Sequence, residues 1–470
     1  MQRITFAFVF LALAACQSFA PAAKATEPVR AGVVMVEVTP PIGYRMSGYF
    51  YERLSTGTHN LLHAKAIVLE QGDQRFAWVF CDMVGVPSSV TSKVRTEAAK
   101  ATGIPHENIF IGATHSHTGP LYFGPLRDYF HKTAIDKAGS DSQEAVDYPA
   151  EFSKKLVDVI TSAAKQTEPV ELSAGFAEQL GLSFNRRYKL RNGTVATNPG
   201  KLNPNIVGPA GPIDPQVGLL QLRRNGKPVA GLTVFALHAD TTGGTEFSAD
   251  YPFFLGERLK RDLGPEYLSI FAPGTCGDIN HLDLSTARLQ KSHQESQRIG
   301  DTLGTTVAAA LKKLPAIDQP KLASASKTVS VPLQRYTPAE IAAAREKLSK
   351  VGTRTLPMVE QVAAVKVAGI GDYGTDKLPM DIQAFRLSDS VAIVALPGEL
   401  FSELGLDIKK RSPFPTTIVV ELSNDYPGYI PTRRGFAEGG YEPNYSKLEP
   451  GGGELLAEAA VQLLTELHSR

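Results

Sequence analysis

Residues 108–117 read NIFIGATHSH, a short apolar run that ends in two histidines. Its first half has the length and the β-branched and aromatic content that are typical of a buried strand. The chain breaks directly afterwards, at Gly119 and Pro120. In α/β proteins, functional side chains gather where such strands end. The stretch therefore predicts an element of a central sheet together with a candidate site formed by His115 and His117.

Strand-like and helix-like segments alternate along the rest of the chain. Apolar and β-branched runs indicate strands, and apolar residues repeated every three or four positions indicate helices. The alternation predicts an α/β fold with central mixed sheets covered by helices, in a single catalytic domain that could divide into two lobes. Strands are predicted at residues 33–38, 64–69, 76–80, 108–112, 218–222, 231–236, 382–387 and 390–396, and helices at residues 90–101, 152–165, 300–314, 337–348 and 453–467.

Residues 122–147 differ from this pattern because they are polar and lack clear periodicity. We expect an inserted loop here, which either borders a site or is mobile. No internal repeat or low-complexity linker interrupts the chain.

The composition is that of an ordinary globular protein. Of 470 residues, 43% are hydrophobic and 21% are charged, which excludes a disordered chain, a collagen and a coiled coil. The 49 Lys and Arg residues balance the 48 Asp and Glu residues to leave a formal charge of +1, and no basic run is present. We therefore expect no nucleic acid as a partner and no electrostatic attraction to a membrane surface.

The first 25 residues have the features of a signal peptide. Arg3 is followed by an apolar run at residues 4–15, which is too short to span a bilayer as a helix. Two processing routes are open. The LAAC order at residues 13–16 resembles a bacterial lipobox, which would lipidate Cys16 and attach the protein to a membrane, whereas residues 23–25 offer an ordinary cleavage site. We favour the lipobox, and either route predicts export to the periplasm, the outer membrane or the medium.

Cysteine is too scarce for a disulfide framework. The chain has three cysteines, Cys16, Cys81 and Cys276. After export, Cys81 and Cys276 could pair in an oxidising compartment, although their positions in the sequence do not show that they meet.

The spacing of the two histidines indicates a metal or substrate site. On an extended backbone, residues two apart project to the same face, so His115 and His117 could both reach one ion or one substrate. His-x-His is common at zinc sites because neutral imidazole suits this borderline metal. Two nearby histidines can equally be structural or surface residues.

Other polar residues follow apolar runs in the same way. His238 follows the predicted strand at residues 231–236, with Asp240 as a possible supporting partner. Glu399 follows the predicted strand at residues 390–396, and Tyr429 follows the apolar run at residues 417–422. Each has a simpler interpretation: His238 as a hydrogen-bonded core residue, Glu399 as a helix N-terminal charge, and Tyr429 as a packed aromatic.

Residues 274–281 read GTCGDINH and follow the apolar run at residues 268–272. Their glycines would let the backbone approach a ligand closely.

The order of these motifs resembles the catalytic domain of the neutral, non-lysosomal ceramidase family. The motifs are ATHSHTGP, NRR, ALHA, GTCGDIN, PGEL, YPGYIPT and GGYE, and the resemblance runs from the neighbourhood of Arg30 to the C-terminus. Tyr429 and Tyr441 are 12 residues apart, as in the family. The resemblance implies the zinc ligands His115, His238, Glu399 and Tyr429, and it implies His117, Arg186 and Tyr441 as substrate-contacting or oxyanion-stabilising groups.

The family chemistry is hydrolysis of the N-acyl amide bond of ceramide or a related lipid. A zinc ion with an open position would activate water for attack on the amide carbonyl. The resemblance assigns His115 to zinc and His117 to the substrate, where His117 could pass a proton to the leaving amine. The general base stays open.

Two departures separate this chain from the family. Asn280 aligns with a serine important for ceramidase activity; an amide can orient a substrate but cannot be a nucleophile, so a serine mechanism is excluded if the alignment holds. The catalytic domain is expected over residues 30–470, without the C-terminal β-sandwich module of full-length relatives. The substrate therefore stays open between an N-acyl lipid, another small amide or an ester, and a surface binding protein that has lost catalysis is a further alternative.

Overall fold

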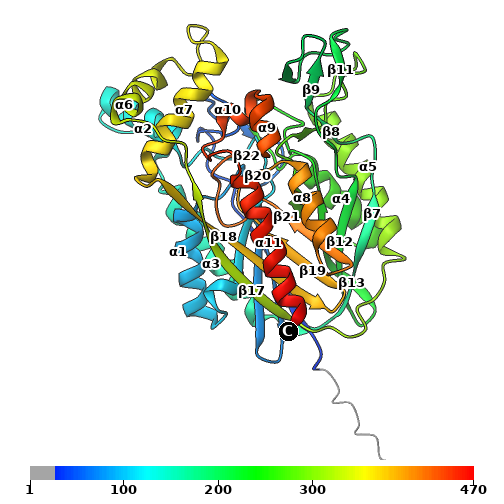
Figure 1. Ribbon diagram of the computed structural model, residues 1–470. Helices are drawn as coiled ribbons and strands as arrows, with labels where there is room; N and C mark the ends of the chain where they lie inside the picture. Colours follow the sequence, from blue (N-terminus) through cyan, green and yellow to red (C-terminus); the bar gives the residue numbers. More distant parts are fainter. Residues whose placement is uncertain (1–26) are drawn as a thin grey trace, which may run out of the picture.

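The computed structural model describes residues 27–470 (Figure 1). The predicted signal peptide and Cys16 therefore lie outside the described residues. Three sheets form the body of the protein, and helices cover one face of each sheet. The predicted α/β fold with mixed sheets and covering helices is confirmed.

The first sheet has five strands in the order β5-β4-β3-β1-β6. Its pairs are antiparallel except for β4 and β5, which are parallel. Two helices, α1 (Ser88–Thr102) and α3 (Tyr148–Lys165), pack on one face. The strands are β1 (Arg30–Glu37), β3 (His63–Gln71), β4 (Gln74–Cys81), β5 (Ile109–Ala113) and β6 (Glu168–Pro169).

The second sheet has the order β15-β13-β12-β7, with one parallel pair, β13 and β15. Helices α4 (Tyr251–Leu263) and α5 (His293–Leu311) lie side by side on its outer face (Figure 1). The strands are β7 (Glu171–Glu178), β12 (Gln216–Arg224), β13 (Lys227–Phe235) and β15 (Leu268–Pro273).

The third sheet has the order β17-β18-β19-β21 and again one parallel pair, β19 and β21. Helices α8 (Ser402–Arg411) and α11 (Gly452–Ser469) cover it. The strands are β17 (Ala323–Pro332), β18 (Lys377–Ser388), β19 (Val391–Ala395) and β21 (Thr416–Val420).

The inner faces of the three sheets share one apolar core. Along β4, Phe76 and Trp78 point into this core, while the alternate residues Ala77 and Val79 point to α1 and α3. The ring of Phe385 on β18 packs 5.1 Å from that of Phe76. Strands buried on both faces read as continuous apolar runs, which is why they were predictable from the sequence.

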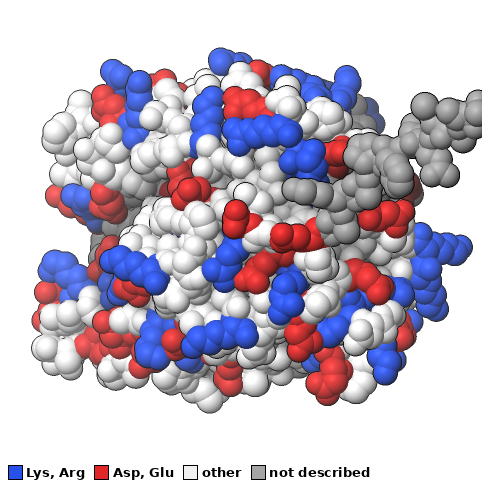
Figure 2. Space-filling model, turned by 90° about the horizontal axis from the view of Figure 1, so that it is seen from below, with Lys and Arg blue, Asp and Glu red and all other residues white. Residues whose placement is uncertain are grey.

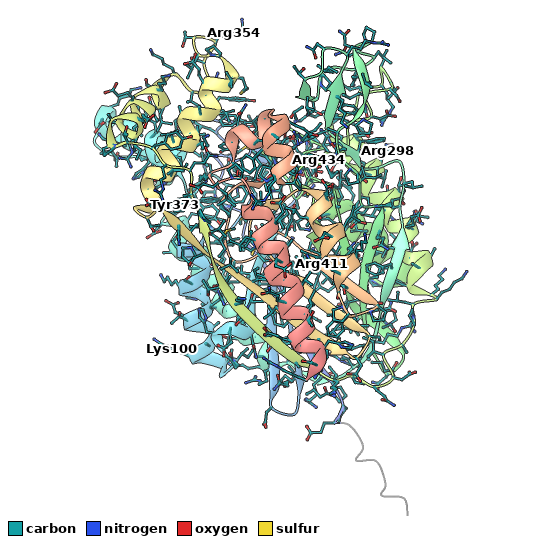
Figure 3. The ribbon with its side chains drawn as sticks, in the orientation of Figure 1. Lys100, Arg298, Arg354, Tyr373, Arg411 and Arg434 are labelled. Atoms are coloured by element: carbon teal, nitrogen blue, oxygen red, sulfur yellow. The ribbon has the colours of Figure 1, made fainter. Side chains whose placement is uncertain are left out.

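Two smaller groups of elements project beyond one end of the sheets (Figure 1). One is the three-stranded sheet β10-β9-β11; the other holds α2, α6 and α7, with Arg354 near its tip and Tyr373 at its base (Figure 3). The short strands β20 and β22 and the helices α9 and α10 lie between them. The bounds are β9 (Arg187–Leu190), β10 (Val195–Thr197), β11 (Ile206–Pro209), α2 (Pro125–Ala138), α6 (Pro338–Lys347), α7 (Met358–Tyr373), β20 (Glu399–Leu400), β22 (Tyr429–Ile430), α9 (Arg433–Glu438) and α10 (Tyr441–Tyr445).

The prediction of a loop at residues 122–147 was wrong, because α2 occupies much of this segment. Only Leu126 of this helix is buried, so its sequence carries almost no apolar periodicity. Leu126 belongs to a small separate hydrophobic cluster that also contains Val365 and Ala368 of α7. The helix thus depends on a contact distant in sequence.

Cys81 and Cys276 are both free and buried, so the disulfide that the sequence left open is not formed. Among residues 27–470, no helix has both the length and the apolar character needed to cross a bilayer. Basic and acidic side chains are interspersed on the face shown in Figure 2.

Candidate metal centre

The predicted zinc ligands come together from four segments that are distant in the sequence. His115 lies two residues beyond β5 and His238 three residues beyond β13. Glu399 and Tyr429 are direct partners in the parallel pair of β20 and β22. Paired residues of neighbouring strands project to the same side, so this register sets Tyr429 beside Glu399.

His115 does not have the extended backbone that the sequence analysis assumed. Its φ of 68° is in the left-handed region, which a non-glycine residue adopts at a cost of about 1–3 kcal/mol and which is concentrated at functional sites. Its Nδ1 is 2.7 Å from the carbonyl oxygen of Val84. Donation by Nδ1 to that carbonyl leaves the Nε2 lone pair free for a metal.

Three potential ligand atoms converge in a dry interior. The Oε2 atom of Glu399 is 3.2 Å from His115 Nε2 and 3.3 Å from His238 Nε2. All three residues are almost fully buried. Tetrahedral zinc with bonds of about 2.0–2.1 Å separates its ligand atoms by about 3.3 Å.

The charges also fit a metal. Neither carboxylate oxygen of Glu399 has a hydrogen-bond partner among the described residues, and a buried carboxylate left in that way is costly. Although burial opposes ionisation, His115 and His238 hold the pKa of Glu399 well below its ordinary value. Burial lowers the pKa of His238. A carboxylate and two imidazoles are donors that zinc commonly takes, so the residues present fit this metal.

His117 belongs to the same cluster. Its Nε2 is 3.2 Å from His115 Nε2, and the two nitrogens and one ring nitrogen of His238 all lie within 4.8 Å of one another. Burial lowers the pKa of His117 to about 4. The Nδ1 atom of His117 is 3.1 Å from the Gly48 carbonyl oxygen. Geometry alone thus allows His117 to bind either metal or substrate.

Gly48 is needed at this contact. Its φ is 96°, and a Cβ added to it would lie 2.6 Å from the Cβ of His117. Only glycine lets the backbone at residue 48 approach His117 so closely.

Arg186 brings a buried positive charge to the cluster. Its Nη1 lies 3.2 Å from His238 Nε2, and its Nη2 donates to the Gly277 carbonyl at 2.8 Å. Its guanidinium carbon is 5.2 Å from the ring centre of Tyr429. A fixed cation beside the candidate ligands can stabilise negative charge that develops on a substrate oxygen.

Aromatic rings line the centre on the side of α10. The ring of Tyr429 lies 5.5 Å from that of Tyr441 and 5.8 Å from that of Tyr445. Burial raises the pKa of Tyr441, so its hydroxyl stays protonated and able to donate a hydrogen bond at neutral pH. Phe50 contacts both Tyr441 and Tyr445.

One expectation about a supporting residue was wrong. Asp240 does not support His238: it accepts hydrogen bonds from the Tyr49 hydroxyl at 3.1 Å and from Lys291 Nζ at 2.9 Å, while His238 Nδ1 has no partner among the described residues. Gly277 lets the backbone pass close to β20, because a Cβ there would lie 2.4 Å from the Glu399 carbonyl oxygen, and its approach to a ligand stays a prediction.

Asn280 is buried, and its side chain is engaged at both ends. Its amide donates to Asn198 at 2.9 Å, and its carbonyl accepts from the backbone N–H of Leu282 at 3.0 Å. A role for Asn280 toward a substrate stays a prediction.

Two buried acids beside the centre were not predicted from the sequence. Glu442 binds Arg186, and Glu421 accepts a hydrogen bond from the backbone N–H of Leu400, next to Glu399. Glu442 lies in the GGYE motif, directly after Tyr441. An acidic residue next to apolar and aromatic residues could have indicated its buried role from the sequence. No pattern in the neighbouring sequence predicted a role for Glu421, because its contacts form only in the folded protein.

Comparison with known proteins gives a family match over part of the chain and a shared fold. Residues 30–247 match the family described as neutral/alkaline non-lysosomal ceramidase, N-terminal. The structure is similar to that of a neutral ceramidase from Pseudomonas aeruginosa, with a TM-score of 0.72 and 19% identity over 94% of this chain and 75% of that chain. It is also similar to a ceramidase complexed with C2, with a TM-score of 0.70 and 18% identity over 94% of this chain and 76% of that chain.

No curated protein sequence matches the chain. The family match and the shared fold nevertheless agree with the motifs read from the sequence. Residues 30–247 are thus similar to the N-terminal part of the neutral/alkaline ceramidase family, and the whole chain has a fold similar to that of neutral ceramidase.

Proposed function

We propose that the protein is a zinc-dependent amidohydrolase that cleaves the N-acyl bond of ceramide or a related N-acyl lipid. The observation that carries the proposal is the convergence of His115, His238 and Glu399 on one buried point, where the Glu399 carboxylate lacks a hydrogen-bond partner among the described residues. The match of residues 30–247 to a ceramidase family supports a ceramidase-like hydrolase. The proposed zinc ligands are these three residues and Tyr429.

Zinc bound by these ligands would supply a Lewis acid that polarises a carbonyl and makes water acidic enough to react near neutral pH. The protein residues supply orientation and charge. The hydrogen bond of His115 to Val84 fixes its ring, and the strand pair of β20 and β22 fixes Glu399 beside Tyr429.

His117, Arg186 and Tyr441 are the proposed catalytic residues for the substrate. Attack on an amide places negative charge on the carbonyl oxygen, and the buried guanidinium of Arg186 and the protonated hydroxyl of Tyr441 are suited to stabilise it. His117 presents its Nε2 to the same cluster and would pass a proton to the departing amine. Glu442 positions Arg186.

Export remains part of the proposal. We propose that residues 1–25 direct the chain out of a bacterial cytoplasm and that lipidated Cys16 holds it at a membrane, close to lipid substrates. Metabolic labelling with a radioactive fatty acid tests this: label should enter the wild-type chain and be lost in Cys16→Ser. Unlabelled wild-type protein in a cleaved, exported form would instead support the ordinary cleavage site.

A substrate panel with purified protein tests the reaction. Ceramide, a shorter N-acyl amide and an ester of the same acyl chain are compared for the chelator-treated protein, the zinc-reconstituted protein and His115→Ala. We expect zinc to restore turnover, ceramide to be the best substrate and His115→Ala to be inactive. Best turnover of the ester or the short amide would change the substrate class, and full amidase activity of His115→Ala would refute the proposal.

A further inference from the structure

A second group of metal-ligating side chains lies beside a pocket of about 820 Å³, which Glu246 and His293 line. His59, Glu246 and His293 each offer one ligand atom, and the three atoms all lie within 4.8 Å of one another. None of these residues takes part in the proposed hydrolysis.

The backbone holds the three residues in place. The strand β2 (Gly57–Thr58) pairs in parallel with β14 (Glu246–Phe247), and the N–H of His59 donates to the Phe247 carbonyl at 2.9 Å. His293 is the first residue of α5, and the N–H of Ser292 before it donates to the Thr241 carbonyl at 3.0 Å. The backbones of three segments distant in sequence are therefore held close together before any ion binds.

The two imidazole rings lie against each other, and rotation of the exposed His59 side chain would let both rings point a nitrogen at one ion. Their rings stack with centres 3.6 Å apart and planes 18° from parallel. The Nδ1 atom of His293 is 3.2 Å from the Thr242 hydroxyl, and its Nε2 is 3.7 Å from Glu246 Oε2. A hydrogen bond at one ring nitrogen commonly orients a histidine so that the other binds the metal.

The carboxylate of Glu246 is not neutralised by a basic side chain. Among the described residues, no Lys or Arg forms an ion pair with it, and the ring of His293 is the one ionisable group within 4 Å of its oxygens. A third cluster shows the contrast: His131, Asp141 and Glu144 are similarly close, but Arg45 and Arg127 bind both of its carboxylates. That cluster is an ion-pair network, whereas the carboxylate of Glu246 is free to bind a cation.

We propose that His59, Glu246 and His293 bind a divalent transition-metal ion such as Zn²⁺ at a site separate from the candidate metal centre. Two imidazoles and one carboxylate suit a borderline metal and leave coordination positions open to water or to a group in the pocket. The ion would join β2, β14 and the start of α5, and would stabilise the folded protein by mass action.

Zinc titration of a variant without the candidate metal centre tests this site. The chain carrying His115→Ala and His238→Ala is treated with chelator and titrated with ZnCl₂ by isothermal calorimetry. We expect one bound zinc. Adding His293→Ala should weaken binding by at least about ten-fold; Thr242→Val should weaken it about ten-fold, and Thr242→Ser should restore it. His131→Ala is the matched control and should leave the affinity unchanged.

Absence of zinc binding in the folded double variant, or unchanged affinity after His293→Ala, would overturn the proposal. If the double variant does not fold, bound zinc is measured by elemental analysis at fixed free zinc for the wild type and His293→Ala. The expected difference is one zinc per chain, and equal zinc content overturns the proposal. Because this readout is metal content, failure of the proposed hydrolysis would leave it unaffected.

Discussion

Glu442 accepts a hydrogen bond from Arg186 across 2.7 Å, although the two residues are 256 positions apart in the chain. The side chains are 0% and 8% exposed, so the ion pair lies in the interior. The Thr197 hydroxyl donates to the second carboxylate oxygen at 2.8 Å. The pair links the helix that begins with Tyr441 to the segment that carries Arg186, and it holds the guanidinium beside His238.

Glu442→Gln removes the charge of this acid and keeps its size. An uncompensated guanidinium in the interior is costly, and breaking a buried pair typically costs about 3–5 kcal/mol. We expect the free energy of unfolding to fall by about 3 kcal/mol and kcat to fall, with bound zinc unchanged. Urea denaturation, steady-state kinetics and elemental analysis measure the three effects.

The exposed pair of Lys154 and Asp158 provides the control for that substitution. Asp158→Asn should change stability by less than about 1 kcal/mol. A Glu442→Gln protein as stable and as active as the wild type would show that Glu442 does not position Arg186.

Gly48→Ala should displace His117. The added Cβ would meet the Cβ of His117 at 2.6 Å, and a shift of about 1 Å in a catalytic group can cost about a hundred-fold in rate. Gly43 is a matched control, because its φ of 92° is close to the 96° of Gly48 but a Cβ there would meet nothing within 4 Å. We expect both variants to lose stability from backbone strain, and only Gly48→Ala to lose most of its kcat. Equal kcat in the two variants would show that His117 does not take part in the reaction.

Glu421 should support zinc binding through Glu399. Its Oε2 accepts from the Leu400 N–H at 2.7 Å, and the Cys276 thiol is 3.0 Å from its Oε1. Glu421→Ala leaves the Leu400 N–H unsatisfied and frees the strand that carries Glu399, so we expect zinc affinity to fall by about 10–100-fold. Glu421→Gln keeps an acceptor oxygen and should retain more affinity. Equal zinc affinity in Glu421→Ala and the wild type, measured by competition with a chelator, would contradict this role.

Asp141 should make stability depend on acidity. Although burial opposes ionisation, hydrogen bonds from Arg45 and His131 lower the pKa of Asp141. A lowered folded-state pKa contributes stability above the unfolded-state pKa of about 3.9, and this contribution is lost as the pH falls through the folded-state pKa. The stability difference between wild type and Asp141→Asn should therefore be largest near neutral pH and shrink below about pH 4. A difference that is constant from pH 7 to pH 3 in urea denaturation would contradict this linkage.

The sequence predicted elements that have a strong local pattern. The helix expected at residues 152–165 is α3, because its apolar residues recur at helical spacing and its buried face packs on the first sheet. The strand at residues 76–80 is part of β4. The helix α2 was missed because one residue, Leu126, accounts for its buried face.

The residues of the candidate site that lie in recognisable sequence motifs could be predicted. His115 and His117 do converge, with their Nε2 atoms 3.2 Å apart, but through a left-handed residue rather than an extended strand. Glu442 and Glu421 could not be assigned from the sequence, because their partners are brought to them by elements distant in the chain.

A crystal structure of the zinc-loaded protein, with anomalous diffraction recorded on both sides of the zinc edge, tests the central claim most directly. The account predicts an anomalous peak within bonding distance of His115, His238, Glu399 and Tyr429, with His117 left for the substrate. A peak held by the three histidines without Glu399, or no peak at this centre, would contradict it.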